Sequence, residues 1–258
     1  MPNTRIIPKL EVKGENLIKG MHLEGLRIVG KPEQRAVDYY KDGADELIYI
    51  DLVASLYQRD NFLHIVEKTA EQVFIPMTVG GGIRSVDDAR AFLRAGADKV
   101  SINTAIISNP KLISDIANTF GAQCMVASLE VQKKVDGNYE CYTDCGRTPT
   151  GKDPFEWAKI VVEKGAGEIL LTSINQDGTF KGYDLDLVNR IAAAIKVPVI
   201  ASGGAGKLED FERVIKEGKA DAVCASAFFH FQRGTVKQVK EYLDEKGISV
   251  RLVKDKKK

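Results

Sequence analysis

The feature that most constrains how this chain can fold is an internal repeat of about half its length. Residues 76–83, PMTVGGGI, return as residues 198–205, PVIASGGA, and GADE at 43–46 returns as GAGE at 165–168. Two more pairs keep the same order along the chain: 97–100 with 220–223, and 6–11 with 125–130. Because self-similarity at a fixed spacing marks a repeated structural unit, we predict two similar halves.

The strand and helix pattern identifies the repeated unit. Short apolar runs alternate with amphipathic stretches, which is the pattern of parallel strands covered by helices. Strands are predicted at 5–11, 46–52, 75–79, 98–102, 124–130, 167–173, 197–202 and 221–225, and helices at 60–73, 86–95, 110–120, 155–164, 184–195 and 208–217. A length of 258 residues fits one barrel of this class, since such barrels run to roughly 250 residues. The predicted fold class is α/β: a single (β/α)8 TIM barrel over residues 1–258, with half-barrels at about 1–122 and 123–245 and its active site at the C-terminal mouth.

Glycines mark several predicted helix ends, and two segments interrupt the rhythm. A helix often ends at a left-handed glycine. Four glycines stand just beyond a helical pattern: Gly43, Gly96, Gly165 and Gly218. Segment 12–30 is rich in glycine, and segment 131–143 predicts a hairpin that turns at Asp136-Gly137. Both segments follow a strand directly, so we expect them to fold over the mouth of the barrel.

The charge balance and the lack of long apolar runs limit the classes of partner. Lysine and arginine total 37 and aspartate and glutamate total 36, so no global field favours nucleic acid or a membrane surface. No segment reaches the ~20 apolar residues that a membrane span needs. We expect a cytoplasmic protein with no nucleic-acid or membrane partner and with a solvated basic tail at 254–258. The scattered cysteines and histidines match no metal motif, so neither a metal nor a cofactor is expected.

Glycine strings after two equivalent strands predict phosphate sites. Glycine lets backbone N–H groups approach an anion closely, and each string precedes a helix. The second-half site comprises Gly203, Gly204 and Ser226, and the first-half site comprises Gly81, Gly82, Asn103 and Thr104. Two such cradles indicate a substrate that carries phosphate at both ends. The alternative is that both strings are tight turns only.

Two glutamates at equivalent strand ends are the candidate catalytic pair. Glu11 and Glu130 end the first and fifth strands, and carboxylates at this end of a barrel strand are usually catalytic. One could donate a proton while the other accepts one, if their surroundings separate their pKa values. Alternatively, both only form ion pairs with loop lysines such as Lys13 or Lys19. Further polar candidates at the mouth are Asp51 and Asp177.

Four charged residues occupy predicted strand starts, at the opposite end of the barrel: Arg5, Glu46, Lys99 and Glu168. Their side chains could close into one ring at the barrel floor. Since a buried ion pair often barely offsets its desolvation, such a ring is a poor device for stability alone. It could be a plug or a gate, and the residues alone favour neither.

Several segments together resemble one known family. TVGGGI at 78–83, ADKVSINT at 97–104, GAGEILLTS at 165–173 and IASGGAG at 200–206 are similar to the HisF family, the cyclase subunits of imidazole glycerol phosphate synthase. The similarity covers essentially the whole chain. In that family a glutaminase docks on the N-terminal face, and ammonia passes through the barrel to the mouth. There it reacts with a ribulosyl aminoimidazole carboxamide bisphosphate, which yields imidazole glycerol phosphate and aminoimidazole carboxamide ribotide. The resemblance implies a lyase of histidine biosynthesis with a HisH-like glutaminase subunit as its partner.

The resemblance also implies roles for individual positions. The ring of Arg5, Glu46, Lys99 and Glu168 matches the family's gate to the ammonia tunnel, and Asp98 matches a residue of the glutaminase interface. The resemblance, together with the glycine strings and polar strand ends described above, gives these substrate-binding candidates: Lys19, Asp51, Gly81, Gly82, Asn103, Thr104, Thr172, Asp177, Gly178, Gly203, Gly204 and Ser226.

The catalytic pair departs from the family pattern. The family has aspartate at both strand ends, in a Cys-Leu-Asp-Val context at the first, whereas this chain has KLEV at 9–12 and Glu130. An extra methylene moves a carboxylate by roughly 1 Å, and a displacement of that size can lower a rate by about 10²-fold. Asn175 also replaces an aspartate that is usual in the family, while Asp177 remains. The paired change suggests a pocket refitted to another substrate.

Four functions stay open on the sequence alone. The first is the cyclase, with Glu11 and Glu130 as its acid–base pair. The second is a HisF-like paralogue that, with a HisH-like glutaminase and a separate sugar amidotransferase, channels ammonia for amidation of a bacterial surface-polysaccharide sugar. The third is the sister isomerase of the same half-barrel repeat, which needs no ammonia and leaves the charged ring unexplained. The fourth is a non-catalytic conduit for ammonia, which leaves the glycine cradles unexplained.

Overall fold

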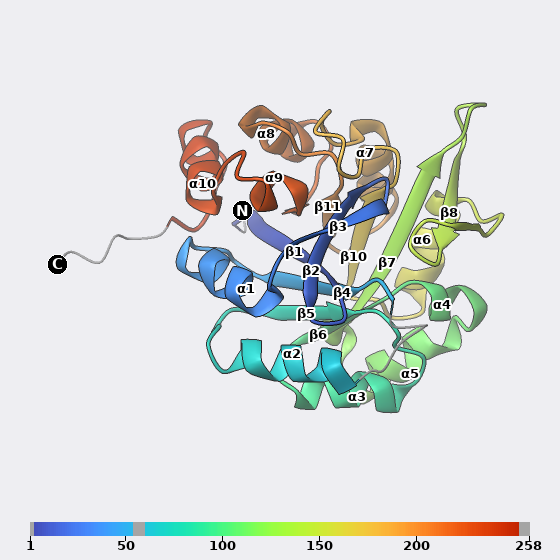
Figure 1. Ribbon diagram of the computed structural model, residues 1–258. Coiled ribbons are helices and arrows are strands. Elements are labelled where there is room, and N and C mark those ends of the chain that lie inside the picture. The colour runs from blue at the N-terminus through green and yellow to red at the C-terminus, as the bar shows by residue number, and fades with distance from the viewer. Residues whose placement is uncertain (1–2, 54–59, 253–258) are drawn as a thin grey trace.

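The fold is a closed barrel of parallel strands surrounded by helices. The computed structural model describes residues 3–53 and 60–252. Within them, eight parallel strands pair in chain order, and the last pairs with the first, which closes the barrel. Figure 1 shows the helices packed around the outside of these strands. The barrel strands are β1 (Arg5–Lys13), β4 (Leu47–Asp51), β5 (Met77–Gly80), β6 (Lys99–Ile102), β7 (Met125–Lys133), β10 (Glu168–Ser173), β11 (Val199–Ser202) and β12 (Ala222–Ala225).

The predicted barrel and its strands are confirmed, and the ring of helices is more complete than the sequence pattern predicts. The predicted helix ranges leave out α1 (Pro32–Lys41), of which only the end at Gly43 is predicted, and α10 (Val236–Glu245); both helices pack on β1. The other helices are α2 (Asp60–Ala70), α3 (Val86–Arg94), α4 (Thr104–Ser108), α5 (Lys111–Phe120), the 3-10 turn η1 (Ala122–Cys124), α6 (Pro154–Glu163), α7 (Leu185–Ala194), α8 (Leu208–Lys216) and α9 (Ala227–His230). In the described part of the chain, no helix has the length and apolar character needed to cross a membrane.

Alternate side chains of β1 mark the layers of the barrel interior, because successive residues of a strand point to opposite sides. Arg5 belongs to a charged floor, Ile7 to an apolar layer, and Lys9 and Glu11 to a polar mouth. The apolar layer consists of Ile7, Ile48, Val126, Leu170, Ile200, Ala222 and Cys224, all buried. Side chains on the other side of the strands pack with the helices in a larger core. Polar groups inside the barrel therefore gather at its two ends.

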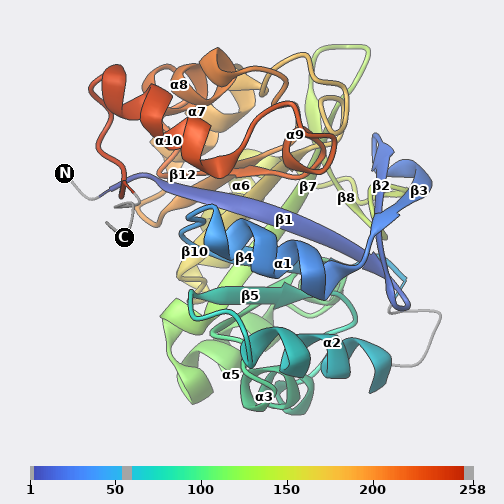
Figure 2. The ribbon, with the colours of Figure 1, turned by 60° about the vertical axis from the view of Figure 1, so that its left-hand side comes forward.

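Two hairpins extend the mouth, one from the first strand of each half. β2 (Asn16–Met21) pairs with β1 and with β3 (Glu24–Gly30), and β8 (Tyr139–Thr143) pairs with β7 and with β9 (Thr148–Pro149). Figure 2 shows both at the end of the barrel toward which β1 runs. The turn predicted at Asp136-Gly137 is confirmed, and Gly137 has a φ of 86°. The sequence predicts that residues 12–30 lie over the mouth without assigning them a structure, and the structure has a hairpin there.

Three of the four predicted glycine helix ends are confirmed. Gly43, Gly96 and Gly165 have φ values of 93°, 107° and 108°. The prediction is wrong at the end of α8, where Lys219 takes a positive φ of 60° in place of Gly218. A Cβ at Gly218 would lie 2.6 Å from the Val214 carbonyl oxygen, so close packing explains this glycine.

Candidate active site

Four charged side chains form a buried cluster at the mouth. Lys19 of β2 donates to Glu11 Oε2 at 2.7 Å and to the two carboxylate oxygens of Asp177 at 3.0 and 2.9 Å. Lys9 Nζ lies 2.9 Å from Glu11 Oε1. Each of the four residues is at most 4% exposed. Two cations and two anions therefore compensate one another, as buried charges must.

This cluster fixes the charge of Glu11. Burial alone would raise the pKa of its carboxyl, but the charges of Lys19 and Lys9 outweigh burial and lower the pKa from 4.5 to about 2. The ion pair with Lys19 that the sequence offered as an alternative is present, whereas Lys13 is exposed. Lys9 is a second partner that the sequence pattern did not single out. Glu11 is therefore an anion throughout the neutral pH range.

Glu130 holds the equivalent position in the second half, in a different environment. Its Oε2 accepts a hydrogen bond from the backbone N–H of Gly146 at 2.8 Å. Part of the residue is open to a cavity, yet burial outweighs the Gly146 bond and the charge of Lys9, and raises the pKa of the carboxyl from 4.5 to about 7. At neutral pH Glu11 is ionised, while Glu130 can both hold and release a proton. An acid–base pair requires such a difference.

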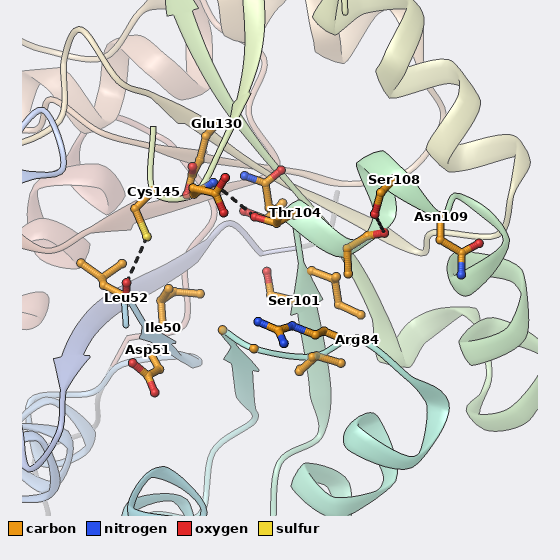
Figure 3. Close-up of a pocket in the computed structure, with 18 residues that line it drawn as sticks. Ile50, Asp51, Leu52, Arg84, Ser101, Thr104, Ser108, Asn109, Glu130 and Cys145 are labelled. Carbon is orange, nitrogen blue, oxygen red and sulfur yellow. Dashed lines mark hydrogen bonds between the residues drawn. The ribbon is translucent and has the colours of Figure 1, made fainter. Parts of the chain in front are cut away.

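A cavity of about 340 Å³ lies beside Glu130. Figure 3 shows the Arg84 side chain extended into it toward Ser101. The predicted residues that line it are Asp51, Gly81, Gly82, Asn103, Thr104 and Glu130. The lining also includes residues that the sequence reading missed: Arg84, Ser101, Ser108, Asn109, Ser128, Asp144 and Cys145. Arg84 brings a cation, and the sequence signal that could have identified it is its position two residues after the glycine string.

The local geometry explains the residue types of this first-half cradle. Gly81 has a φ of 104°, and a Cβ there would come within 2.3 Å of the Asp51 carbonyl oxygen. Asn103 Nδ2 donates to a β8 carbonyl at 3.0 Å, and the Asp144 N–H donates to Thr104 Oγ1 at 3.2 Å. These two side chains therefore hold the β8 hairpin against the cradle.

The second-half cradle is much smaller. Its volume of about 10 Å³ has room for roughly one water molecule. The predicted residues that line it are Asp177, Gly178, Gly203, Gly204 and Ser226, and Lys9 joins them. Lys19 lies in the charge cluster described above. Thr172 lies on β10 opposite Glu130 and is not among the residues that line either cavity.

Asn175 holds the second hairpin. Its Oδ1 accepts a hydrogen bond from the Lys133 N–H at 2.7 Å, and its Nδ2 donates to the Lys133 carbonyl at 3.2 Å. An ionised aspartate could accept the first bond but could not donate the second. Asparagine therefore ties the loop after β10 to the end of β7.

The four charged residues at the floor form a closed ring. Arg5 pairs with Glu46 at 2.8 Å and with Glu168, and Lys99 pairs with Glu46 at 3.0 Å and with Glu168 at 2.9 Å. Thr78 Oγ1 donates to Glu46 Oε1 at 2.6 Å. Each glutamate thus has both cations as partners. The ring closes the floor beneath the apolar layer, as both the plug and the gate hypotheses require.

Three other sequence expectations concern the surface, metals and the tail. Asp98 is exposed at the start of β6, and its Oδ2 accepts the Met77 N–H at 2.8 Å. Among residues 3–53 and 60–252, no group of three or more His, Cys, Asp or Glu side chains could hold a metal ion. The basic tail at 254–258 lies outside the described residues.

The closed parallel barrel, with its polar site at the carboxyl ends of the strands, defines a (β/α)8-barrel protein. Residues 5–234 match the sequence model of a family described as histidine biosynthesis protein. The chain is 61% identical over 211 residues to the imidazole glycerol phosphate synthase subunit HisF of Legionella pneumophila, which covers 82% of this chain and 100% of that protein. It is 49% identical over 248 residues to the subunit of the same name from Natranaerobius thermophilus, which covers 96% and 98%. The chain belongs to the histidine biosynthesis protein family and, within it, to the HisF proteins.

Proposed function

We propose that this chain is a cytoplasmic cyclase subunit of imidazole glycerol phosphate synthase, a lyase of histidine biosynthesis. It converts a ribulosyl aminoimidazole carboxamide bisphosphate and ammonia to imidazole glycerol phosphate and aminoimidazole carboxamide ribotide. The observation that carries the proposal is the unequal surroundings of the two carboxyls at the mouth: Glu11 pairs with Lys9 and Lys19, while Glu130 accepts one backbone N–H beside the cavity. These contacts keep Glu11 ionised and raise the pKa of Glu130 to about 7. The name shared by both relatives supports the same assignment.

In this proposal the two glutamates divide the chemistry between them. Ammonia becomes cationic when it adds to a carbonyl carbon, and the adduct must then lose a proton. Ionised Glu11 stabilises the positive charge. A carboxylate with a pKa of about 2 is a weak base, so proton transfer falls to Glu130, whose pKa of about 7 suits both acceptance and return of a proton.

The two cradles would hold the phosphate ends of the substrate. The first-half cradle offers the glycine turn of Gly81 and Gly82 and the cation of Arg84, and the second-half cradle offers Gly203, Gly204 and Ser226. The remaining candidates for contacts with the middle of the substrate and with the cradle edges are Lys19, Asp51, Asn103, Thr104, Thr172, Asp177 and Gly178.

The proposed partner is a HisH-like glutaminase on the N-terminal face. Asp98 is exposed at that end, and the ring of Arg5, Glu46, Lys99 and Glu168 closes the floor there. Ammonia released by the partner would enter through the ring and cross the apolar layer. That layer favours neutral ammonia over charged species, because an unpaired ion in apolar surroundings is far more costly than a neutral molecule.

Replacing Lys99 by methionine is expected to uncouple the two subunits. Methionine removes the charge and leaves Arg5 as the cation that Glu46 and Glu168 share. The ratio of glutamine-driven to ammonium-driven turnover should fall several-fold when both nitrogen sources are measured on the complex. Lys111→Met, at an exposed helix lysine, is the matched control. An unchanged ratio in Lys99→Met would refute the gate and make the ring a plug.

A turnover assay tests the proposed function. Purified protein is supplied with the ribulosyl bisphosphate and an ammonium salt at alkaline pH, and the loss of substrate absorbance should show turnover. Undetectable turnover that is restored by Glu11→Asp combined with Glu130→Asp would contradict the cyclase assignment for the natural chain. Sugar amidation with a separate amidotransferase would then be the hypothesis to test, although neither relative's name supports it.

A further inference from the structure

Lys9 is a buried cation with one carboxylate partner, Glu11, among the described residues. It lies on β1 between Ile7 of the apolar layer and Glu11, and it is 4% exposed. An ammonium group has three donors. Lys9 Nζ lies 2.9 Å from Glu11 Oε1, yet that oxygen has no hydrogen bond of normal geometry from any described residue. Lys19, in contrast, donates to three carboxylate oxygens. Lys9 is therefore the cation of the cluster that can turn to another acceptor.

The second-half cradle, which Lys9 lines, offers further groups that fit an anion. Gly203 and Gly204 form its turn, with φ values of 95° and 115°. Ser226 also lines it and is 7% exposed, and its hydroxyl has no hydrogen-bond partner among the described residues. A hydroxyl can donate to a phosphate oxygen. A buried hydroxyl without a partner among the described residues and an ammonium with donors to spare therefore line the same small space.

The charges around this cradle explain why an anion would need a cation of its own there. Asp177 lines the cradle, and Glu11 lies in contact with Lys9. Like charges at such short range repel strongly where water is excluded. Lys19 already binds both carboxylates and could not turn away without leaving Asp177 without its cation. Lys9 is thus the available counter-charge on this side of the cluster.

The small volume of the second-half cradle also indicates that Lys9 moves when an anion enters. About 10 Å³ is too little for a phosphate group, so part of the lining must move before one can enter. The backbone of Gly203 and Gly204 is packed closely, since a Cβ at Gly204 would lie 2.1 Å from the Gly182 carbonyl oxygen. Lysine has a flexible four-carbon stem. A turn of Lys9 would enlarge the cradle and place its ammonium beside the entering group.

We propose that Lys9 is the cationic ligand of a phosphomonoester dianion in the second-half cradle, and that it leaves Glu11 for this anion when the phosphate enters. The inference rests on the proposed function for the identity of the substrate, but any phosphate dianion can test it. After the turn, Lys19 still holds Glu11 Oε2, while Oε1 opens to the substrate. Occupation of the cradle thereby frees one oxygen of a candidate catalytic carboxylate.

Residue-resolved amide NMR of the full chain, titrated with inorganic phosphate, tests this proposal. Lys9→Met keeps the length of the side chain and removes its charge. The affinity reported by the amides of Gly204 and Ser226 should fall roughly ten- to hundredfold, as expected for loss of one charge-assisted hydrogen bond. The affinity reported by the first-half amide of Thr104 should stay unchanged. Lys13→Met, at an exposed lysine of the same strand, is the control and should alter neither.

The unaltered protein supplies a second measurement that does not depend on the folding of the variant. The Nζ resonance of Lys9 should shift when phosphate is added, in step with the Gly204 amide. A Lys9 resonance that does not respond, or a folded Lys9→Met that binds phosphate at Gly204 as before, would overturn the proposal and leave Lys9 as a partner of Glu11 alone. Because neither measurement uses turnover, failure of the cyclase assignment would be recognised separately.

Discussion

Replacing Glu130 by glutamine is expected to lower the turnover of the ribulosyl bisphosphate by about 10²–10⁴-fold, the contribution typical of a positioned acid or base. Glutamine can still accept the Gly146 N–H that Glu130 binds at 2.8 Å, but it cannot carry a proton at neutral pH. The measurement is the steady-state rate with saturating ammonium on both sides of pH 7. The rate of the unaltered protein should change as Glu130 titrates near pH 7, whereas the residual rate of the variant should lack that step. Retention of most of the rate by Glu130→Gln would remove Glu130 from proton transfer.

The same variant should be more stable than the unaltered protein at alkaline pH, which separates lost chemistry from lost folding. Burial raises the folded-state pKa of Glu130 from 4.5 to about 7, so the fold favours the protonated carboxyl. This contribution is complete below pH 4.5 and is lost as the pH rises through 7, where ionisation of the carboxyl costs up to roughly 3 kcal/mol. In urea unfolding, the free energy of unfolding of Glu130→Gln should therefore increase relative to that of the unaltered protein as the pH rises. Glu163→Gln, at an exposed glutamate of α6, should show no such gain.

The fold could be predicted from the sequence because its strongest signals are local. Parallel strands that are covered on both faces appear in the sequence as short apolar runs, and the internal repeat shows the same pattern in both halves of the chain. Helix α1 has no side-chain cap at its N-cap residue, Lys31, and only Pro32 at its first position and Gly43 beyond its end mark it in the sequence. Helix α10 did carry a readable signal, a capping box formed by Thr235 and Gln238.

The position of the candidate site follows from the sequence as well, but the charges of its side chains do not. Glu11 and Glu130 are equivalent in the repeat, and strand ends converge at the mouth whatever the side chains are. Their protonation differs because Lys9 and Lys19 contact Glu11, while the Glu130 carboxyl has one hydrogen bond from the part of the chain that the structure describes, donated by the Gly146 N–H. Lys19 reaches Asp177, far along the chain, only once the barrel has closed. Such a contact has no local signature in the sequence.

Replacing Lys19 by methionine is expected to lower the free energy of unfolding by about 3–5 kcal/mol, the cost typical of removing one partner from a buried ion pair. Lys19 is 2% exposed and holds Glu11 and Asp177 from the β2 strand, so it fastens the first hairpin over the loop after β10. Without it, two buried carboxylates share Lys9 as their cation. Urea unfolding near neutral pH measures this loss of free energy. The control Lys13→Met, at an exposed lysine of β1, should leave the free energy of unfolding almost unchanged.

The pH dependence and a second substitution distinguish lost charge from lost packing in Lys19→Met. Burial opposes ionisation of Glu11, and Lys19 is the strongest charge that lowers its pKa, so removing Lys19 raises that pKa. Protonation of Glu11 then relieves the repulsion with Asp177, and the loss of stability should shrink as the pH falls. Adding Glu11→Gln should likewise recover part of the loss. A loss that is equal at acid and neutral pH, and that Glu11→Gln does not reduce, would show that Lys19 holds the hairpin through its aliphatic stem and not through the charge cluster.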